Sequence, residues 1–266
     1  MKNHTPLLLL ALAGFAFSNP TVVYAPDVVL RVAQDETPQD PAVKSDVVQG
    51  TATGRVVFEG SLPPKKDLTI PEAAAKGCTS DGSKVSAQNM QLMIHEDRGI
   101  ANVLVTIEVE GQKLRVPKEP VVLDQIQCRF DQHVVVVLAG TTISFRNSDA
   151  VPHNVHTFSR KNKPFNRTLP GHSSYEAVME RAESIQISCD FHSWMRSYLC
   201  VVDTNFYALT DAHGAFSIPG LPPGEYTAKL WHEKLGRSSV ALAVAADGTC
   251  KPLEVKLAAK QSRRSK

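Results

Sequence analysis

The sequence lacks the features by which common classes of enzyme and membrane protein are recognised. No long segment has the 3.6-residue apolar period of an amphipathic helix, and no apolar run is long enough to cross a bilayer. Gly-x-Ser-x-Gly, Walker and His-Glu-x-x-His patterns are absent, as are His-x-His pairs. We therefore expect no transmembrane segment and a protein that is not an enzyme.

An excess of charge of one sign is also missing. The 266 residues include 29 basic and 27 acidic side chains. Loss of residues 1–25 would remove Lys2 alone and leave 28 basic against 27 acidic side chains. Nucleic-acid-binding domains usually carry a clear basic excess, so we expect no nucleic acid among the partners. The basic ending Arg263 to Lys266 belongs to a predicted disordered tail, residues 259–266.

The N-terminus has the three parts of an export signal. Lys2 supplies a positive charge, Leu7 to Phe17 an apolar stretch, and Val23-Tyr24-Ala25 a small-residue cleavage site. Residues 1–25 are therefore predicted to be a signal peptide, with an uncleaved membrane anchor as the alternative. Residues 26–49 are rich in Asp, Pro and Gln, which predicts a flexible linker. We expect an exported protein, periplasmic or otherwise extracytoplasmic.

From Gly50 onward the pattern is that of β-strands. A two-residue alternation predicts a half-buried strand in which Val103, Val105, Ile107 and Val109 alternate with Leu104, Thr106, Glu108 and Glu110. Val134–Leu138 and Thr142–Phe145 read as two strands on either side of a turn at Ala139-Gly140. Short strands separated by turns rich in Gly and Pro are typical of β-sandwiches. We predict an all-β protein.

The most informative segment runs from Cys189 to Met195 and reads Cys-Asp-Phe-His-Ser-Trp-Met. It places a thiolate, an imidazole and a thioether within seven residues, and His153 adds an imidazole upstream. Sulfur donors combined with two imidazoles suit copper, with methionine as a weak axial ligand. Zinc is the alternative, because cysteine and histidine also form tetrahedral zinc sites. The methionine favours copper.

Residues 119–203 resemble a cupredoxin, and most closely the amicyanin-like pattern. The matching motifs are Asn-x-x-x-x-Pro-His-Asn-Val-His, which ends at His156, and Cys-x-x-His-x-x-Met, which begins at Cys189. The resemblance implies a Greek-key sandwich that holds one type 1 (blue) copper ion. The ligands that it implies are His153, Cys189, His192 and Met195.

The same resemblance assigns roles around the metal. Asn154 would join the two ligand loops and help to orient the Cys189 sulfur. His156 is a further histidine that the family does not use as a ligand, and we retain it as a possible extra one. His192 would reach the surface as the electron port. The residues expected to surround it are Phe191, Trp194, Val151 and Pro152.

The flanking segments resemble a carboxypeptidase-regulatory-like (transthyretin-like) β-sandwich that has been split. The first piece includes Gly50 to Val57, and the second has a Thr-Asp-x-x-Gly-x-Phe-x-Ile strand from Thr210 followed by Pro-Pro-Gly-x-Tyr from Pro222. We therefore predict a discontinuous domain of residues 50–118 and 204–258, with a cupredoxin-like domain of residues 119–203 inserted into it. Three small units in a row are the alternative.

Five cysteines are present, at positions 78, 128, 189, 200 and 250. If Cys189 binds metal, the other four allow three pairings, and an exported protein can keep disulfides. We favour Cys78–Cys128 together with Cys200–Cys250. The alternative for Cys200 is a small buried side chain, because it lies within an apolar run.

The predicted function is one-electron transfer between redox protein partners by a mononuclear copper centre. One alternative is a binding or scaffold module. In that case the discontinuous carboxypeptidase-regulatory-like domain recognises carbohydrate or a cell-surface partner, and the metal only stabilises loops. Another is copper storage or delivery. Colour separates these hypotheses, because a type 1 centre should be blue when oxidised and bleach on reduction.

Overall fold

The computed structural model describes residues 48–259, and every regular element among them is a β-strand. The prediction of an all-β fold is confirmed. None of these residues forms a helix that could cross a membrane. The predicted signal peptide, nearly all of the predicted linker and all but the first residue of the predicted tail lie outside the described residues.

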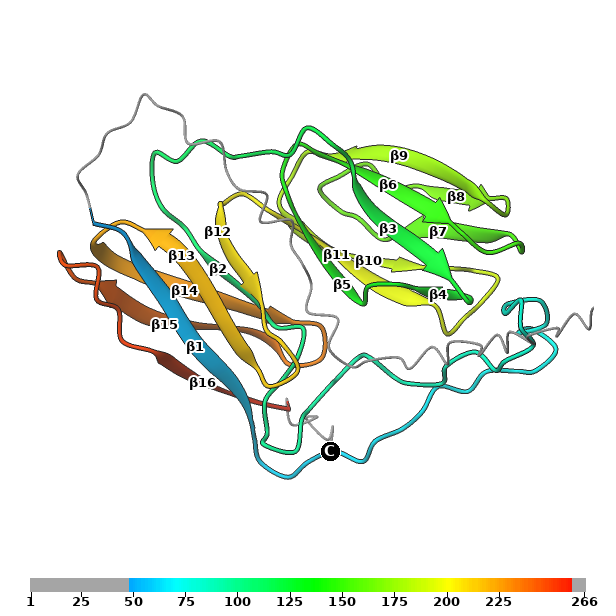
Figure 1. Cartoon of the computed structure of the whole chain (residues 1–266), viewed down its shortest axis with the longest axis horizontal. Coiled ribbons are helices and arrows are strands. Elements are labelled where there is room, and N and C mark those ends of the chain that lie inside the picture. The colour runs from blue at the N-terminus through cyan, green and yellow to red at the C-terminus, as the bar shows by residue number, and fades with distance from the viewer. Residues whose placement is uncertain (1–47, 260–266) are drawn as a thin grey trace, which may run out of the picture. The chain divides into compact units, whose positions relative to one another are not determined.

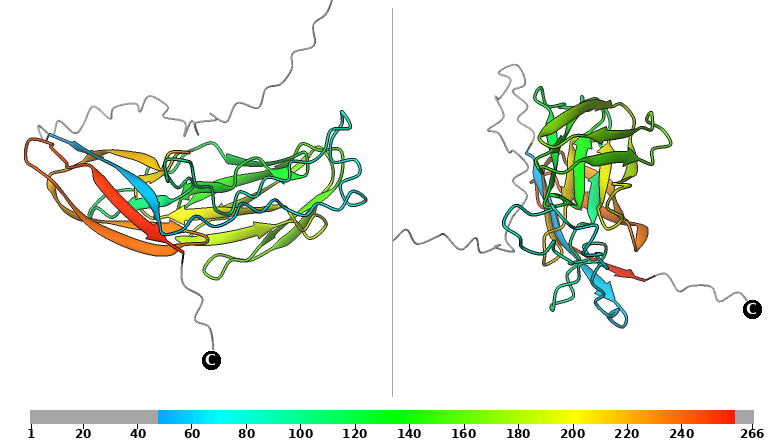
Figure 2. Two further views of the ribbon diagram at one scale, coloured as in Figure 1. Left: turned by 90° about the horizontal axis from the view of Figure 1, so that it is seen from below. Right: turned by 90° about the vertical axis from the view of Figure 1, so that its right-hand side faces the viewer.

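Seven strands form one pair of sheets, which we call the outer sandwich. One sheet has the order β13-β1-β16 and the other β12-β2-β14-β15 (Figure 1). The strands are β1 (Gly50–Glu59), β2 (Leu104–Ile107), β12 (Phe206–Leu209), β13 (Ala215–Leu221), β14 (Gly224–His232), β15 (Gly236–Val244) and β16 (Leu253–Ala258). Figure 2 shows β1 in blue beside β16 in red, two strands that pair in parallel. A continuous apolar core that includes Val56, Ile107 and Leu230 fills the space between the sheets.

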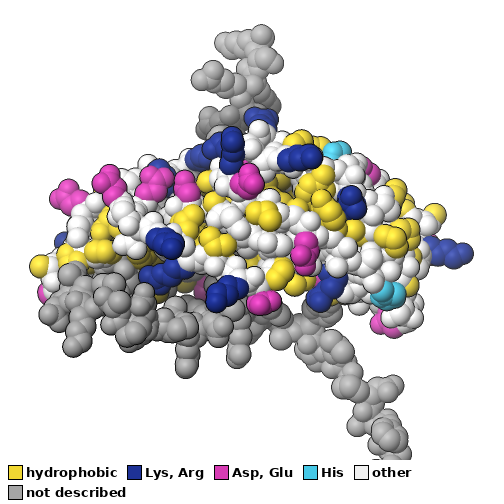
Figure 3. Space-filling model, turned by 90° about the horizontal axis from the view of Figure 1, so that it is seen from above, with side chains coloured by type: hydrophobic (Ala, Val, Ile, Leu, Met, Phe, Trp, Pro, Cys, Tyr) yellow, Lys and Arg dark blue, Asp and Glu magenta, His cyan; other side chains and the backbone are white. Residues whose placement is uncertain are grey.

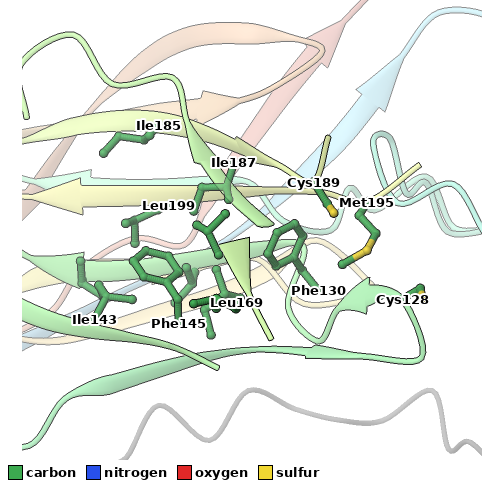
Figure 4. Close-up of a cluster of buried hydrophobic side chains, with 14 of the residues drawn as sticks. Cys128, Phe130, Ile143, Phe145, Leu169, Ile185, Ile187, Cys189, Met195 and Leu199 are labelled. Carbon is green, nitrogen blue, oxygen red and sulfur yellow. The ribbon is translucent and has the colours of Figure 1, made fainter. Parts of the chain in front are cut away.

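The remaining nine strands, residues 121–202, form a second pair of sheets, which we call the inner sandwich. Its sheets have the orders β5-β11-β10-β7-β8 and β4-β3-β6-β9. The strands are β3 (Val121–Ile126), β4 (Arg129–Phe130), β5 (Val134–Leu138), β6 (Thr141–Asn147), β7 (His153–Thr157), β8 (Asn166–Leu169), β9 (Ser173–Met179), β10 (Glu183–Ser188) and β11 (Arg196–Val202). Its core includes Phe145, Ile185 and Leu199, side chains that alternate inward along their strands (Figure 4).

The chain thus leaves the outer sandwich after β2 and returns to it at β12. Described strands from 50–118 and 204–258 contribute only to the outer sheets, and those from 119–203 only to the inner sheets. All of them nevertheless belong to one compact unit of the chain. The division into two domains therefore stays a prediction about independent folding.

A third apolar cluster joins strands of the two sandwiches. It contains Leu104 of β2 together with Val134 and Val202 of the inner sandwich. At its border, the imidazole of His133 contacts the carboxylate of Glu233, and both side chains are buried. The segment Trp-His-Glu at 231–233 therefore contributes to this contact between sheets.

The middle residue of that segment, His232, is buried as a neutral acceptor. Its Nδ1 accepts hydrogen bonds from the backbone N–H groups of Lys234 and Leu235 at 3.2 and 3.3 Å. Burial, aided by the nearby His133 and Lys234, lowers the pKa of His232 to about 4. The native state therefore resists a proton that the unfolded chain accepts near the ordinary pKa of about 6.5.

This difference predicts a loss of stability in mild acid. Between the unfolded pKa and the folded pKa, protons bind the unfolded chain preferentially, so stability falls as the pH falls. Relative to a His232→Asn variant, whose amide oxygen can replace Nδ1, the wild-type free energy of unfolding should drop by about 2 kcal/mol between pH 7.5 and pH 5. Urea unfolding at both pH values measures it. An equal pH response of the two proteins would contradict the prediction.

Candidate metal centre

The predicted ligands lie at one end of the inner sandwich, where three strands begin or end. His153 is the first residue of β7, Cys189 follows directly after β10, and Met195 directly precedes β11. Strands β7 and β10 are neighbours in one sheet, with Ser188 opposite His156. The 189–195 loop is closed by two backbone hydrogen bonds, from Met195 N–H to the His192 carbonyl and from Cys189 N–H to the Met195 carbonyl. Two separate segments therefore converge because the sheet pairs them.

Three donor atoms meet within this end of the core. The Nδ1 atoms of His153 and His192 are 3.0 Å apart, and the Cys189 Sγ lies 4.0 and 3.6 Å from them. An ion about 2.0–2.1 Å from each nitrogen and about 2.3 Å from the sulfur would hold its donors about 3.3–3.9 Å apart. All three side chains are buried. The residues therefore fit one metal ion with small adjustments.

Met195 lies beside these donors. Its side chain is 1% exposed, and Figure 4 draws Cys189 and Met195 next to each other at one end of the apolar cluster. A buried thioether next to a thiolate and two imidazoles completes the set of four donors named from the sequence. The predicted copper ligands are thus brought to one place, and their binding of metal stays a prediction.

The Cys189 thiol is prepared for metal binding by its surroundings. Burial raises its pKa, but hydrogen bonds from His153, His192 and the backbone N–H of Asn154 outweigh burial and lower it to about 6. The Asn154 N–H lies 3.4 Å from the sulfur. Because metals bind the thiolate, a lowered pKa provides the ligand form near neutral pH.

Asp149 is a further candidate site residue that the sequence motifs did not single out. Its carboxylate accepts a hydrogen bond from His153 Nε2 at 2.8 Å, so a neutral His153 ring has its lone pair on Nδ1, the atom that faces Cys189 and His192. The same carboxylate accepts the backbone N–H groups of Gln127 and Cys128. Burial disfavours the charge of Asp149, but these bonds outweigh burial and lower its pKa. A carboxylate four residues before a candidate ligand was the available signal.

Burial also disfavours a proton on His153. The bonds to Asp149 and Cys189 outweigh that effect and raise the pKa of His153. Without metal, the ring therefore retains a proton more readily than a free histidine. Metal binding at Nδ1 must then compete with protons, so metal affinity should weaken in acid.

Asn154 joins the two ligand segments, in the position assigned by the resemblance. Its side-chain oxygen accepts the Asp190 backbone N–H, and its side-chain NH2 donates to the Asp190 carboxylate at 3.0 Å. His156 lies apart from the donor cluster. Its Nδ1 contacts the other Asp190 oxygen at 3.0 Å, and its ring stacks on Phe158. The structure therefore places His156 outside the cluster of the other donors.

The cysteine predictions have mixed outcomes. A disulfide joins Cys78 to Cys128, so the favoured first pairing is confirmed. The Cys200–Cys250 pairing is wrong, because both thiols are free. Cys200 lies on β11 within the cluster that joins the sandwiches, whereas Cys250 packs against the outer core. Cys200 is the buried small side chain of our alternative interpretation, and burial raises the pKa of its thiol to about 12.

The structure buries His192, which the resemblance places at the surface as the electron port. His192 is only 8% exposed, and its Nε2 faces the disulfide, 3.9 Å from Cys78 Sγ and 3.8 Å from Cys128 Sγ. Trp194, expected beside an open port, is buried and donates from Nε1 to the Cys128 carbonyl at 2.9 Å. Phe191 is 51% exposed. The segment that carries Cys78 therefore covers the histidine edge that was expected to reach solvent.

Removal of the Asp149 acceptor should loosen the centre. In an Asp149→Ala variant we expect copper affinity to fall about 10–100-fold, because His153 loses the partner that fixes its ring and tautomer. Competition with a chelator of known affinity measures this. Asp247→Ala, a change at an exposed acidic residue outside the site, should leave affinity unchanged. Equal affinity in both variants would contradict the role of Asp149.

Removal of the disulfide should open the His192 edge. The bond closes a sequence separation of 50 residues, so a Cys78→Ala/Cys128→Ala variant should lose about 4 kcal/mol of stability by the chain-entropy model. The folded variant should also lose metal to a chelator faster than the wild type, because water gains access to His192. A Cys250→Ser variant is the control for loss of a cysteine. Unchanged release kinetics in the folded double variant would show that the disulfide does not shield the centre.

Comparisons with known proteins do not assign this chain to a family. No protein-family model and no curated protein sequence matches the chain. Three solved structures illustrate the structural matches. A Cu-containing nitrite reductase from Thermus scotoductus is 19% identical, and the match covers 37% of this chain and 25% of that chain with a TM-score of 0.31. A purple cupredoxin from Nitrosopumilus maritimus is 22% identical, and the match covers 31% of this chain and 99% of that chain with a TM-score of 0.28. A reduced Cu(I) form of an amicyanin mutant is 21% identical, and the match covers 37% of this chain and 98% of that chain with a TM-score of 0.30.

The chain thus spans a quarter of the length of the nitrite reductase and nearly all of the two smaller proteins. These identities and TM-scores are too low to carry an argument about function. None of the three is described as a carboxypeptidase-regulatory-like protein, so that part of the resemblance stays a prediction.

Proposed function

We propose that this chain is an exported mononuclear type 1 copper protein that transfers single electrons between protein partners. The observation that carries the proposal is the convergence of His153 Nδ1, His192 Nδ1 and Cys189 Sγ in a buried cluster. One thiolate with two imidazoles and a methionine is the donor set of blue-copper electron-transfer sites. When bound, the copper ion would carry the electron by cycling between Cu(I) and Cu(II).

The surroundings of the donors support rigid binding. Asp149 holds the His153 ring, the Asn154 N–H holds the Cys189 sulfur, and the side chain of Asn154 fixes the backbone after Cys189. His153 and Cys189, two of the four donors, are thus each held by a hydrogen-bonding partner outside the donor set. Little rearrangement is then needed when the charge of the centre changes by one.

Two further features support export and protein partners. The Cys78–Cys128 disulfide is of the kind that persists in oxidising compartments. On the face drawn in Figure 3, a row of acidic side chains lies along the upper left edge, and basic and hydrophobic side chains are scattered over the rest without a continuous basic field. Such a surface suits brief protein encounters better than binding to a polyanion.

One observation favours a second candidate function. The disulfide against His192 Nε2 keeps the histidine edge from direct contact with a partner. A metal centre closed in this way also suits a scaffold module, in which the ion holds loops together without changing its oxidation state. In that case zinc would serve as well as copper.

The colour of the copper-loaded protein tests the proposal. The oxidised protein should show an intense blue thiolate-to-copper absorption that ascorbate bleaches and oxidant restores. Cys189→Ser should abolish this absorption, because no other thiolate meets the histidines among the described residues. Absorption and electron paramagnetic resonance spectra before and after reduction are the measurements.

Two matched controls make the result specific. Cys200→Ser and Cys250→Ser each remove a free thiol outside the donor cluster and should keep the colour. A wild-type protein that stays colourless with copper and binds zinc equally well would support the scaffold function instead. Colour that survives in the Cys189→Ser variant would contradict the ligand assignment.

A further inference from the structure

The geometry points to a second metal site on the outer sandwich. We propose that His95, Asp97 and His213 bind one divalent transition-metal ion of the borderline class, such as Zn(II) or Cu(II), in an open, exchangeable site. Two imidazoles and a carboxylate are donors that such ions accept. This proposal does not rest on the function proposed for the inner sandwich.

The three donors already face one another. His95 Nδ1 lies 3.0 Å from one Asp97 oxygen, and His213 Nδ1 lies 2.9 Å from the other. The two ring centroids are 4.1 Å apart, and one ligand atom from each residue lies within 4.8 Å of the others. Nitrogen and oxygen donors about 2.0–2.2 Å from a tetrahedral ion are about 3.3–3.5 Å apart, so modest side-chain rotation closes the site.

The backbone fixes this arrangement from two distant segments. The 95–99 turn is closed by bonds between His95 and Gly99 and between His95 and Arg98. A side chain at Gly99 would meet the His213 carbonyl, since a Cβ built there would lie 2.0 Å from its oxygen. Gly214, which has a φ angle of 77°, is also closely packed, because a Cβ built there would lie 2.2 Å from the Val56 carbonyl oxygen. Such tight packing brings the two histidines together regardless of any ion.

Neighbouring groups orient the carboxylate. Arg55 Nη2 contacts the Asp97 oxygen that faces His95 at 2.6 Å, and the Gly99 N–H donates to the same oxygen at 3.0 Å. The other oxygen has His213 as its partner. Arg55 thus plays the part of an outer hydrogen-bond partner for a ligating carboxylate. Its charge opposes a cation, but water screens that repulsion at an exposed site.

A simple surface hydrogen-bond cluster is the competing explanation, and zinc binding separates the two. The side chains of His95, Asp97 and His213 are 39%, 40% and 58% exposed. Hydrogen bonds from His213 and the Gly99 N–H are the main causes of a lowered pKa at Asp97, which keeps it anionic. Because Asp97 and the two imidazoles are exposed, an ion bound between them would keep open coordination positions for water, as in exchangeable sites.

Zinc titration of the full-length, metal-free protein tests the proposal. Calorimetry should show one more equivalent of Zn(II) bound to the wild type than to His95→Gln or His213→Gln. Loss of a direct ligand should weaken this site at least about tenfold, because loss of an outer partner alone typically costs that much. On addition of zinc, the ring signals of His95 and His213 should shift in the NMR spectrum.

His172→Gln is the matched control, because His172 is an exposed histidine outside the cluster. It should retain the full zinc stoichiometry. Cys189→Ser tests the inner centre separately, and loss of zinc there should leave the His95 and His213 shifts intact. Equal stoichiometry in the wild type and both cluster variants, or no shift of the two ring signals, would overturn the proposal.

Discussion

The arrangement of the inner centre depends on the hydrogen bonds accepted by one carboxylate. Asp149 accepts the backbone N–H groups of Gln127 and Cys128 and the ring N–H of His153. One side chain thereby fixes both a candidate ligand and a cysteine of the disulfide that covers the other histidine. Gln127 and Cys128 have positive φ angles of 53° and 50°, an unfavourable conformation that the two bonds help to hold. Ligand geometry and cover are therefore coupled through Asp149.

Burial of polar donor atoms costs free energy unless they are hydrogen-bonded, which explains the hydrogen bonds around this site. A buried polar group without a partner is destabilising, and three donors meet here in an apolar core. Two of the three have a partner outside the donor cluster, Asp149 for His153 and the Asn154 N–H for Cys189. The centre is consequently prepared by the fold, with strand pairing between β7 and β10 supplying the convergence.

Local sequence patterns were sufficient to predict the strands and the donor loop. Alternation of apolar residues predicted the strands, and the spacing from Cys189 to Met195 predicted a donor loop between two of them. The contact between His192 and Cys78 spans 114 residues and leaves no local pattern in the sequence. The wrong Cys200 pairing has the same origin, because spacing along the chain does not reveal which core a cysteine faces. Sequence therefore predicted elements better than the contacts between them.

The position of His192 between two sulfur groups limits how an electron could enter. Its Nδ1 faces Cys189 and its Nε2 faces the disulfide, so each ring nitrogen has sulfur atoms as neighbours. If the centre transfers electrons through His192 as proposed, a partner there would meet the disulfide or Phe191, the exposed aromatic next to His192. An apolar side chain half exposed beside a closed centre suits a small, transient interface. Such a partner would thus contact the groups that cover His192 and not its imidazole edge.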